Sequence, residues 1–148
     1  TLIESTLKDL TKQRSVWCFY AVPDSGMSSA ARHLASEAGR SGERRVHIIT
    51  RSPGVPLGET LKQLFGIGHI DQQVMTEALR CLDRDVTLVV DQFDDFEVPP
   101  AADMQMLLLL GQAAHAVGND AHTFSVIALC RRPATYQAAV SCNNNAKE

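Results

Sequence analysis

The chain has 148 residues, of which 45% are hydrophobic and 21% are charged, and its formal net charge is −3 at pH 7. This length suits one domain with a proper hydrophobic core, and the composition is typical of a globular protein. The weak negative charge excludes a general affinity for polyanions, and no apolar run approaches the roughly 20 residues that a membrane-spanning helix needs.

Apolar strands alternate with helical segments along the chain. The predicted elements, in chain order, are a helix over residues 2–13, a strand over 16–22, a helix over 28–38 that stops at Gly39, a strand over 45–50, a helix over 57–65, a helix over 72–82 capped by Asp71, a strand over 86–90, a helix over 101–117, a strand over 123–130 and a short helix after Pro133. This alternation predicts an α/β fold, a three-layer α/β/α sandwich around a mostly parallel sheet of about four to five strands. Right-handed crossovers would bring the loops after the first, third and fourth strands to one edge of that sheet.

The stretch from residue 86 to residue 96, Val-Thr-Leu-Val-Val-Asp-Gln-Phe-Asp-Asp-Phe, is the most informative in the chain. Its continuous apolar run is typical of a strand buried on both faces, and Asp91 follows at the carboxyl end, where open α/β sheets bind ligands. A carboxylate suits Mg²⁺, and in P-loop NTPases this position holds the Mg²⁺ of a bound nucleotide. The alternative without a function is a buried strand followed by an acidic turn.

The segment between the first strand and the next helix partly matches a phosphate-binding loop. Laid on the pattern G-x-x-x-x-G-K-[ST], Ala21 falls on the first Gly and Gly26 on the second. Met27 falls on the Lys, and Ser28 falls on the Ser/Thr that helps to hold Mg²⁺. Half of the defining positions therefore match, and the acidic strand end downstream strengthens the interpretation.

Residues 87–96 resemble the Walker B segment of the STAND class of P-loop NTPases, the signal-transduction ATPases with numerous domains. In the relatives that carry propeller repeats, this segment has an aliphatic run, Asp-Gln-Phe, two acidic residues and an apolar residue. Residues 91–96, Asp-Gln-Phe-Asp-Asp-Phe, have the same order. Those relatives also place an arginine after the fourth strand, where this chain has Arg131. The AAA+ class is a close neighbour that fits the same resemblance.

The resemblance implies a nucleotide site with ATP and Mg²⁺ as its ligands. The implied metal ligands are Ser28 and Asp91, the latter acting through water. The implied catalytic residues are Asp94 or Asp95, which would orient or deprotonate the attacking water, and Arg131, which would sense the γ-phosphate. The implied nucleotide-binding segment, whose amides and helix N-terminus would wrap the β-phosphate, consists of Pro23, Asp24, Ser25, Gly26, Met27, Ser28 and Ser29.

Departures from the family pattern bear on catalysis. Met27 has no charge to replace the missing lysine, Ala21 replaces the first glycine, and Gln92 stands where many related ATPases have a catalytic Glu. Loss of a preorganised cation can cost several kcal/mol in the transition state. The expected function is therefore a degenerate P-loop ATPase-like domain with weak or no hydrolysis, acting as a regulatory or assembly module.

Two other functions stay open. An active Mg²⁺-dependent ATPase of the STAND or AAA+ type would use an arginine in place of the lysine, for example Arg32, Arg51 or Arg131, or a cation from a neighbouring subunit. A different doubly wound domain, flavodoxin-like or receiver-like, is the third hypothesis. Strand order distinguishes it, because a P-loop ATPase of this class places the fourth strand between the first and the third.

Self-association or protein partners are expected, since such ATPases often assemble. Residues 104–110 are apolar on several faces, which predicts a core helix or, alternatively, a subunit interface. Nucleic-acid binding through arginines is less favoured than a solvated face, because the run is short. The arginines of that run are Arg40, Arg44, Arg45 and Arg51.

The 4 cysteines lack the spacing of a zinc site, and two of them fall in predicted strands, so free thiols in a reducing compartment, the cytoplasm or the nucleus, are expected. We expect a single P-loop NTPase-like domain over residues 1–148. The chain starts without Met, and the helical lid or fifth strand of full ATPases of this class is not evident. A fragment that lacks its C-terminal lid is therefore the expectation.

Overall fold

A computed structural model of the chain describes residues 15–20, 26–50, 52, 54–91, 93, 101–117, 122–132 and 134–137. Within this part of the chain, parallel strands form a 4-stranded sheet in the order β1-β4-β3-β2. The strands are β1 (Ser15–Tyr20), β2 (Arg44–Thr50), β3 (Asp85–Asp91) and β4 (Phe124–Cys130). The predicted mostly parallel sheet of about four to five strands is thus confirmed, with 4 strands in the described residues.

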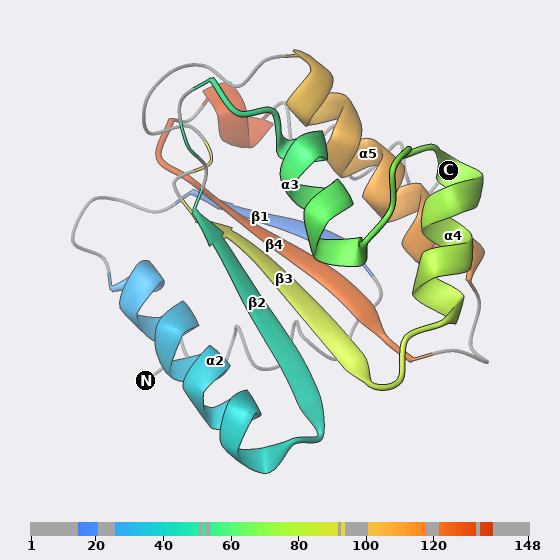
Figure 1. Cartoon of the computed structure of the whole chain (residues 1–148). Coiled ribbons are helices and arrows are strands. Elements are labelled where there is room, and N and C mark those ends of the chain that lie inside the picture. Colours follow the sequence, from blue (N-terminus) through green and yellow to red (C-terminus); the bar gives the residue numbers. More distant parts are fainter. Residues whose placement is uncertain are drawn as a thin grey trace.

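The strand order distinguishes between the fold families considered above. The fourth strand lies between the first and the third, as we expected for a P-loop NTPase (Figure 1). A flavodoxin-like or receiver-like domain has the order 2-1-3-4-5, in which the first and third strands are neighbours. The observed order therefore excludes that alternative.

Helices cover both faces of the sheet and make three layers. Figure 1 shows α2 (Met27–Ser41) on one side, and α3 (Leu57–Phe65), α4 (Gln72–Arg80) and α5 (Ala101–Ala116) on the other. Successive strand residues point to opposite faces, so Val89 packs with α2 whereas Leu88 packs under the other helices. Almost every residue of β3 and β4 is buried, as expected for central strands covered on both faces.

The helix boundaries follow local capping chemistry, and one prediction was wrong. Helix α2 continues through Gly39 to Ser41 and ends at Gly42, whose φ of 72° is left-handed and whose N–H donates to the carbonyl of Ala38. A glycine in a helical conformation costs only about 1 kcal/mol, so Gly39 weakens the helix without ending it. The Asp71 cap is confirmed, because Oδ1 accepts a hydrogen bond from the N–H of Val74 at 2.8 Å.

The apolar stretch of α5 belongs largely to the core. Leu107 and Leu110 are buried, and Met104, Met106 and Leu109 pack against the same cluster. These contacts favour the core-helix prediction for this face of α5. Of the described helices, none combines the length and the apolar character that crossing a membrane requires. The helix predicted over residues 2–13 lies outside the described residues.

Candidate functional site

A serine and an aspartate from distant parts of the sequence meet at the carboxyl-terminal edge of the sheet. Ser28 lies in the first turn of α2, and Asp91 is the last residue of β3. The Ser28 hydroxyl donates a hydrogen bond to Oδ1 of Asp91 at 3.0 Å, across 63 residues of sequence. Asp91 shares the α2-facing side of β3 with Val89, and only 9% of its surface is exposed. The two predicted metal ligands are therefore neighbours.

Gly26 begins the helix that carries the serine. Its φ of 85° and ψ of 6° lie in the left-handed region, which favours glycine, and its carbonyl accepts the N–H of Ala30 at 2.9 Å. Gly26, as the N-cap residue, has no side chain with which to cap this helix end. The first backbone N–H groups of a helix have no intrahelical partners and carry partial positive charge, which suits an anion. The amino-terminal end of α2 thus lies beside Asp91.

The remaining residues of the predicted binding segment are described in part. Ser29 is exposed on α2 next to Ser28, and Met27 is the first residue of the helix. The side chain of Met27 lies outside the described residues. Five further predicted site residues also lie outside the described residues: Pro23, Asp24, Ser25, Asp94 and Asp95.

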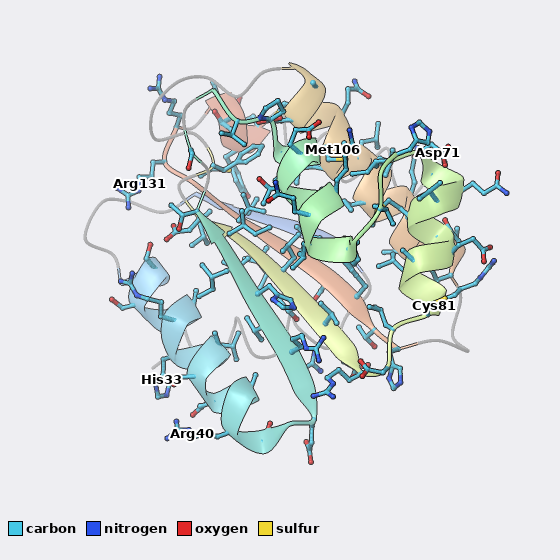
Figure 2. The ribbon with its side chains drawn as sticks, viewed as in Figure 1. His33, Arg40, Asp71, Cys81, Met106 and Arg131 are labelled. Atoms are coloured by element: carbon cyan, nitrogen blue, oxygen red, sulfur yellow. The ribbon has the colours of Figure 1, made fainter. Side chains whose placement is uncertain are left out.

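Arg131 directly follows β4 and is exposed at the edge where the strands end, which Figure 2 shows.

A backbone hydrogen bond ties the segment after β3 to the end of β4. The N–H of Phe93 donates to the carbonyl of Leu129 at 3.3 Å, and the side chain of Phe93 is fully buried in the core cluster that also includes residues of α3, α4 and α5. Sequence reasoning missed this anchor, although a single aromatic residue between acidic positions is a signal for it.

The paired oxygens suit a magnesium ion better than a softer metal. Mg²⁺ is usually bound through one or two carboxylates together with waters and substrate phosphates, rather than by a cage of protein ligands. A serine hydroxyl and one aspartate are hard oxygen donors of that kind. Within the described ranges, no group of three or more His, Cys, Asp or Glu side chains could hold a metal. A site of this composition would therefore depend on the nucleotide for its other ligands.

Arginines at the amino-terminal edge of the sheet, with Arg44 among those weighed for nucleic-acid binding, have acidic or carbonyl partners in the described part of the chain. Arg44 pairs with Asp85 at 3.5 Å, and Arg84 donates to the carbonyl of Gly42 at 3.3 Å and lies 3.5 Å from Asp83. Acidic partners thus offset positive charge at the amino-terminal edge of the sheet. This arrangement favours the solvated-face interpretation, and Arg51 lies outside the described residues.

A cavity of about 230 Å³ lies away from the Ser28–Asp91 pair. It is bounded by the starts of α3 and α5, with Lys62, His69 and Met106 among its lining residues. Neither Ser28 nor Asp91 lines it. The cavity is therefore separate from the candidate site.

No protein-family model matches the chain, and no curated protein matches it. Solved structures resemble it at low identity. A RuvB mutant from Thermotoga maritima matches with a TM-score of 0.49 and 14% identity over 96% of this chain, which spans 42% of the RuvB chain. The P-loop NTPase domain of a sigma-54 transport activator from E. coli matches with a TM-score of 0.44 and 12% identity over 92% of this chain and 89% of that one.

A second Thermotoga maritima structure, described as the RuvB Holliday junction branch migration motor, matches with a TM-score of 0.34 and 14% identity, over 82% of this chain and 43% of that one. The fold assignment itself rests on the observed topology. A parallel sheet in the order β1-β4-β3-β2, with Ser28 and Asp91 adjoining at its carboxyl-terminal edge, makes this a P-loop NTPase-like α/β fold.

Proposed function

We propose that this domain binds a Mg²⁺–nucleotide at the carboxyl-terminal edge of its sheet and hydrolyses it slowly or not at all. The observation that carries the proposal is the 3.0 Å hydrogen bond between Ser28 and Asp91. These side chains come from the two sequence positions that hold Mg²⁺ in P-loop NTPases. A serine–aspartate hydrogen bond can also serve only to stabilise a fold, but this one involves the first turn of α2, whose N-cap residue Gly26 supplies no side-chain cap.

In this proposal each residue has a distinct role. Asp91 would hold Mg²⁺ through water and Ser28 would ligate it directly, while the backbone amides from residue 24 to residue 29 would surround the β-phosphate. Arg131 would contact the γ-phosphate. Asp94 or Asp95 would position the attacking water if hydrolysis occurs.

The substitution at the lysine position determines the expected rate. A thioether at Met27 offers no charge to the β- and γ-phosphates, and such a cation stabilises charge that develops in the transition state. Binding can still use backbone amides, the helix dipole and Mg²⁺, so affinity should decline less than turnover. A domain that binds without turnover would serve as a regulatory or assembly module.

Fluorescence energy transfer tests the binding proposal. Trp17 is the only tryptophan and lies in β1, next to β4, so it can act as donor to a fluorescent ATP analogue. We expect saturable transfer that requires Mg²⁺ and that Asp91→Ala abolishes. Asp83→Asn is the matched control, since Asp83 is exposed and precedes β3 at the opposite edge. No transfer at millimolar analogue would mean that the fold acts only as a scaffold.

Restoring the lysine separates a degenerate domain from an active ATPase. Met27→Lys should tighten binding and raise phosphate release, measured with radiolabelled ATP. Wild-type turnover already comparable to that of Met27→Lys would instead support the active-ATPase alternative. The control is Ser36→Ala, an exposed position farther along α2.

The assembly role has its own test. We propose that nucleotide binding alters self-association or the binding of a protein partner. The molar mass in solution should be measured by light scattering with and without Mg²⁺–ATP. A mass that changes with nucleotide in wild type but not in Asp91→Ala supports the role, whereas a constant mass contradicts nucleotide-controlled self-association.

A further inference from the structure

We propose that Arg32, in the second turn of α2, supplies to a bound polyphosphate the positive charge that Met27 lacks. This inference rests on the proposed nucleotide site and adds a binding residue to it. The ligand class is a nucleoside di- or triphosphate, because the missing lysine normally meets the β- and γ-phosphates.

The position of Arg32 along the helix brings it beneath the serine of the site. Residues four apart on a helix lie one above the other, with Cβ atoms about 5–6 Å apart, and helical side chains lean towards the N-terminus. Arg32 stands four residues after Ser28, whose hydroxyl is bonded to Asp91. A guanidinium extended along this flank therefore reaches the level of the Ser28–Asp91 pair.

Packing leaves the side chain available. The sheet-facing side of α2 is formed by Ala30, Ala31, Leu34 and Ala38, all buried, whereas Arg32 is exposed on the flank that it shares with Ser28. The neighbouring His33 lies 3.1 Å from Glu37 and is thus engaged within the helix. Among the described residues, Arg32 has no hydrogen bond or ion pair.

The chemistry of arginine suits the role. Its guanidinium is always charged and matches phosphate oxygens with two parallel N–H donors, where a lysine offers a point charge. The Arg32 side chain starts about one turn farther along the helix than Met27, and its greater length thus compensates for the neutral side chain at the usual lysine position. Such a contact would favour ATP and ADP over AMP, because only a di- or triphosphate chain extends to the flank of α2 that carries Arg32.

Arg40 offers a matched control on the same helix. It is also exposed and has no hydrogen bond or ion pair with another described residue, but it lies near the end of α2 that is far from the strand tips (Figure 2). Arg32→Gln and Arg40→Gln therefore change net charge equally and differ in distance from the site. Arg32→Lys keeps the charge and shortens the reach.

The test is the dissociation constant of fluorescent ATP and AMP analogues, with Mg²⁺, for wild type and these variants. Arg32→Gln should weaken ATP binding about tenfold, equivalent to about 1.4 kcal/mol, and leave AMP binding unchanged. The dissociation constant of Arg32→Lys for the ATP analogue should lie between those of wild type and Arg32→Gln, and that of Arg40→Gln should match wild type. Thermal unfolding should show that all variants are folded.

A double-mutant cycle makes the inference specific. If Arg32 replaces the lysine, then Arg32→Gln should cost less affinity in the Met27→Lys background than in wild type. Equal ATP affinity of Arg32→Gln and Arg40→Gln, in a wild type that binds, overturns this inference alone. No ATP binding by wild type overturns the proposed function as well.

Discussion

Asp103 on α5 accepts a hydrogen bond from the backbone N–H of Leu57 at 3.0 Å, although 46 residues separate them. Helix α3 begins after Pro56, which offers no side-chain cap of its own. Asp103 is 1% exposed, so a buried carboxylate from another helix satisfies an N–H that α3 leaves without an intrahelical partner. This contact joins the starts of α3 and α5 above the same face of the sheet.

Removing this carboxylate should therefore destabilise the fold. Asp103→Ala leaves the buried N–H of Leu57 without its acceptor, which should lower the free energy of unfolding by about 1–3 kcal/mol in urea denaturation. Asp103→Asn retains an acceptor oxygen and should lose less. Asp83→Ala, at an exposed position, is the control. A loss below about 0.5 kcal/mol for Asp103→Ala, the range of ordinary surface changes, would contradict the cap.

Two glycines of the α2 region should respond oppositely to the same substitution. A Cβ at either Gly26 or Gly39 would meet no atom of the described residues within 4 Å, apart from the adjoining backbone, so backbone conformation is what distinguishes them. Gly26 has a φ of 85°, and alanine there should cost roughly 1–2 kcal/mol. Gly39 is helical, and alanine should add about 0.5–1 kcal/mol. Chemical denaturation of both variants measures this, and equal signs would refute the conformational explanation.

Much of the fold was predictable because local signals were strong. Pro56 and Gly66 bracket α3, and its predicted bounds match those observed. The meeting of Ser28 and Asp91 was also predictable, since parallel strands with right-handed crossovers bring such loops to one edge. The end of α2 was not, because a glycine both weakens a helix and ends one, and only the backbone angles decide which.

Contacts between elements were beyond the sequence. The cap from Asp103 to Leu57 depends on how α5 packs against α3, which periodicity within each helix does not determine. The anchor at Phe93 likewise depends on which strand lies beside β3. The roles predicted for Asp94 and Asp95 fall outside the described residues and stay predictions.

A buried polar pair inside the sheet allows a clean test of hydrogen-bond energetics. Thr87 and Ser125 are register partners on β3 and β4, both are 0% exposed, and their hydroxyl oxygens lie 2.9 Å apart. Thr87→Val or Ser125→Ala alone leaves the other buried hydroxyl without this hydrogen-bond partner, which should lower the free energy of unfolding by about 1–3 kcal/mol. The double variant removes both polar groups and should cost less than the sum of the single variants. Strict additivity in urea denaturation would show that the hydroxyls do not interact.

The final prediction concerns the pH dependence of stability through His47. Burial lowers the pKa of His47, and the Arg45 guanidinium lowers that pKa further. Above the unfolded pKa of about 6.5, the imidazole is neutral in both states. As the pH falls below that value, the unfolded chain takes up the proton more readily, so the free energy of unfolding declines until the pH passes the folded pKa. His47→Gln should lose this component of the decline between neutral pH and the folded pKa.

Arg45→Gln tests the cause of the lowered pKa directly. Removing the guanidinium should raise the pKa of His47 towards its ordinary value, but incompletely, because burial is the larger cause and remains. The midpoint is measured by NMR titration of the His47 ring protons. Arg40→Gln provides the control for net charge, since Arg40 lies on α2 and is not among the causes of the shift. A midpoint that stays constant or falls in Arg45→Gln would show that the arginine does not act on this imidazole, and the pH dependence would then be attributed to burial alone.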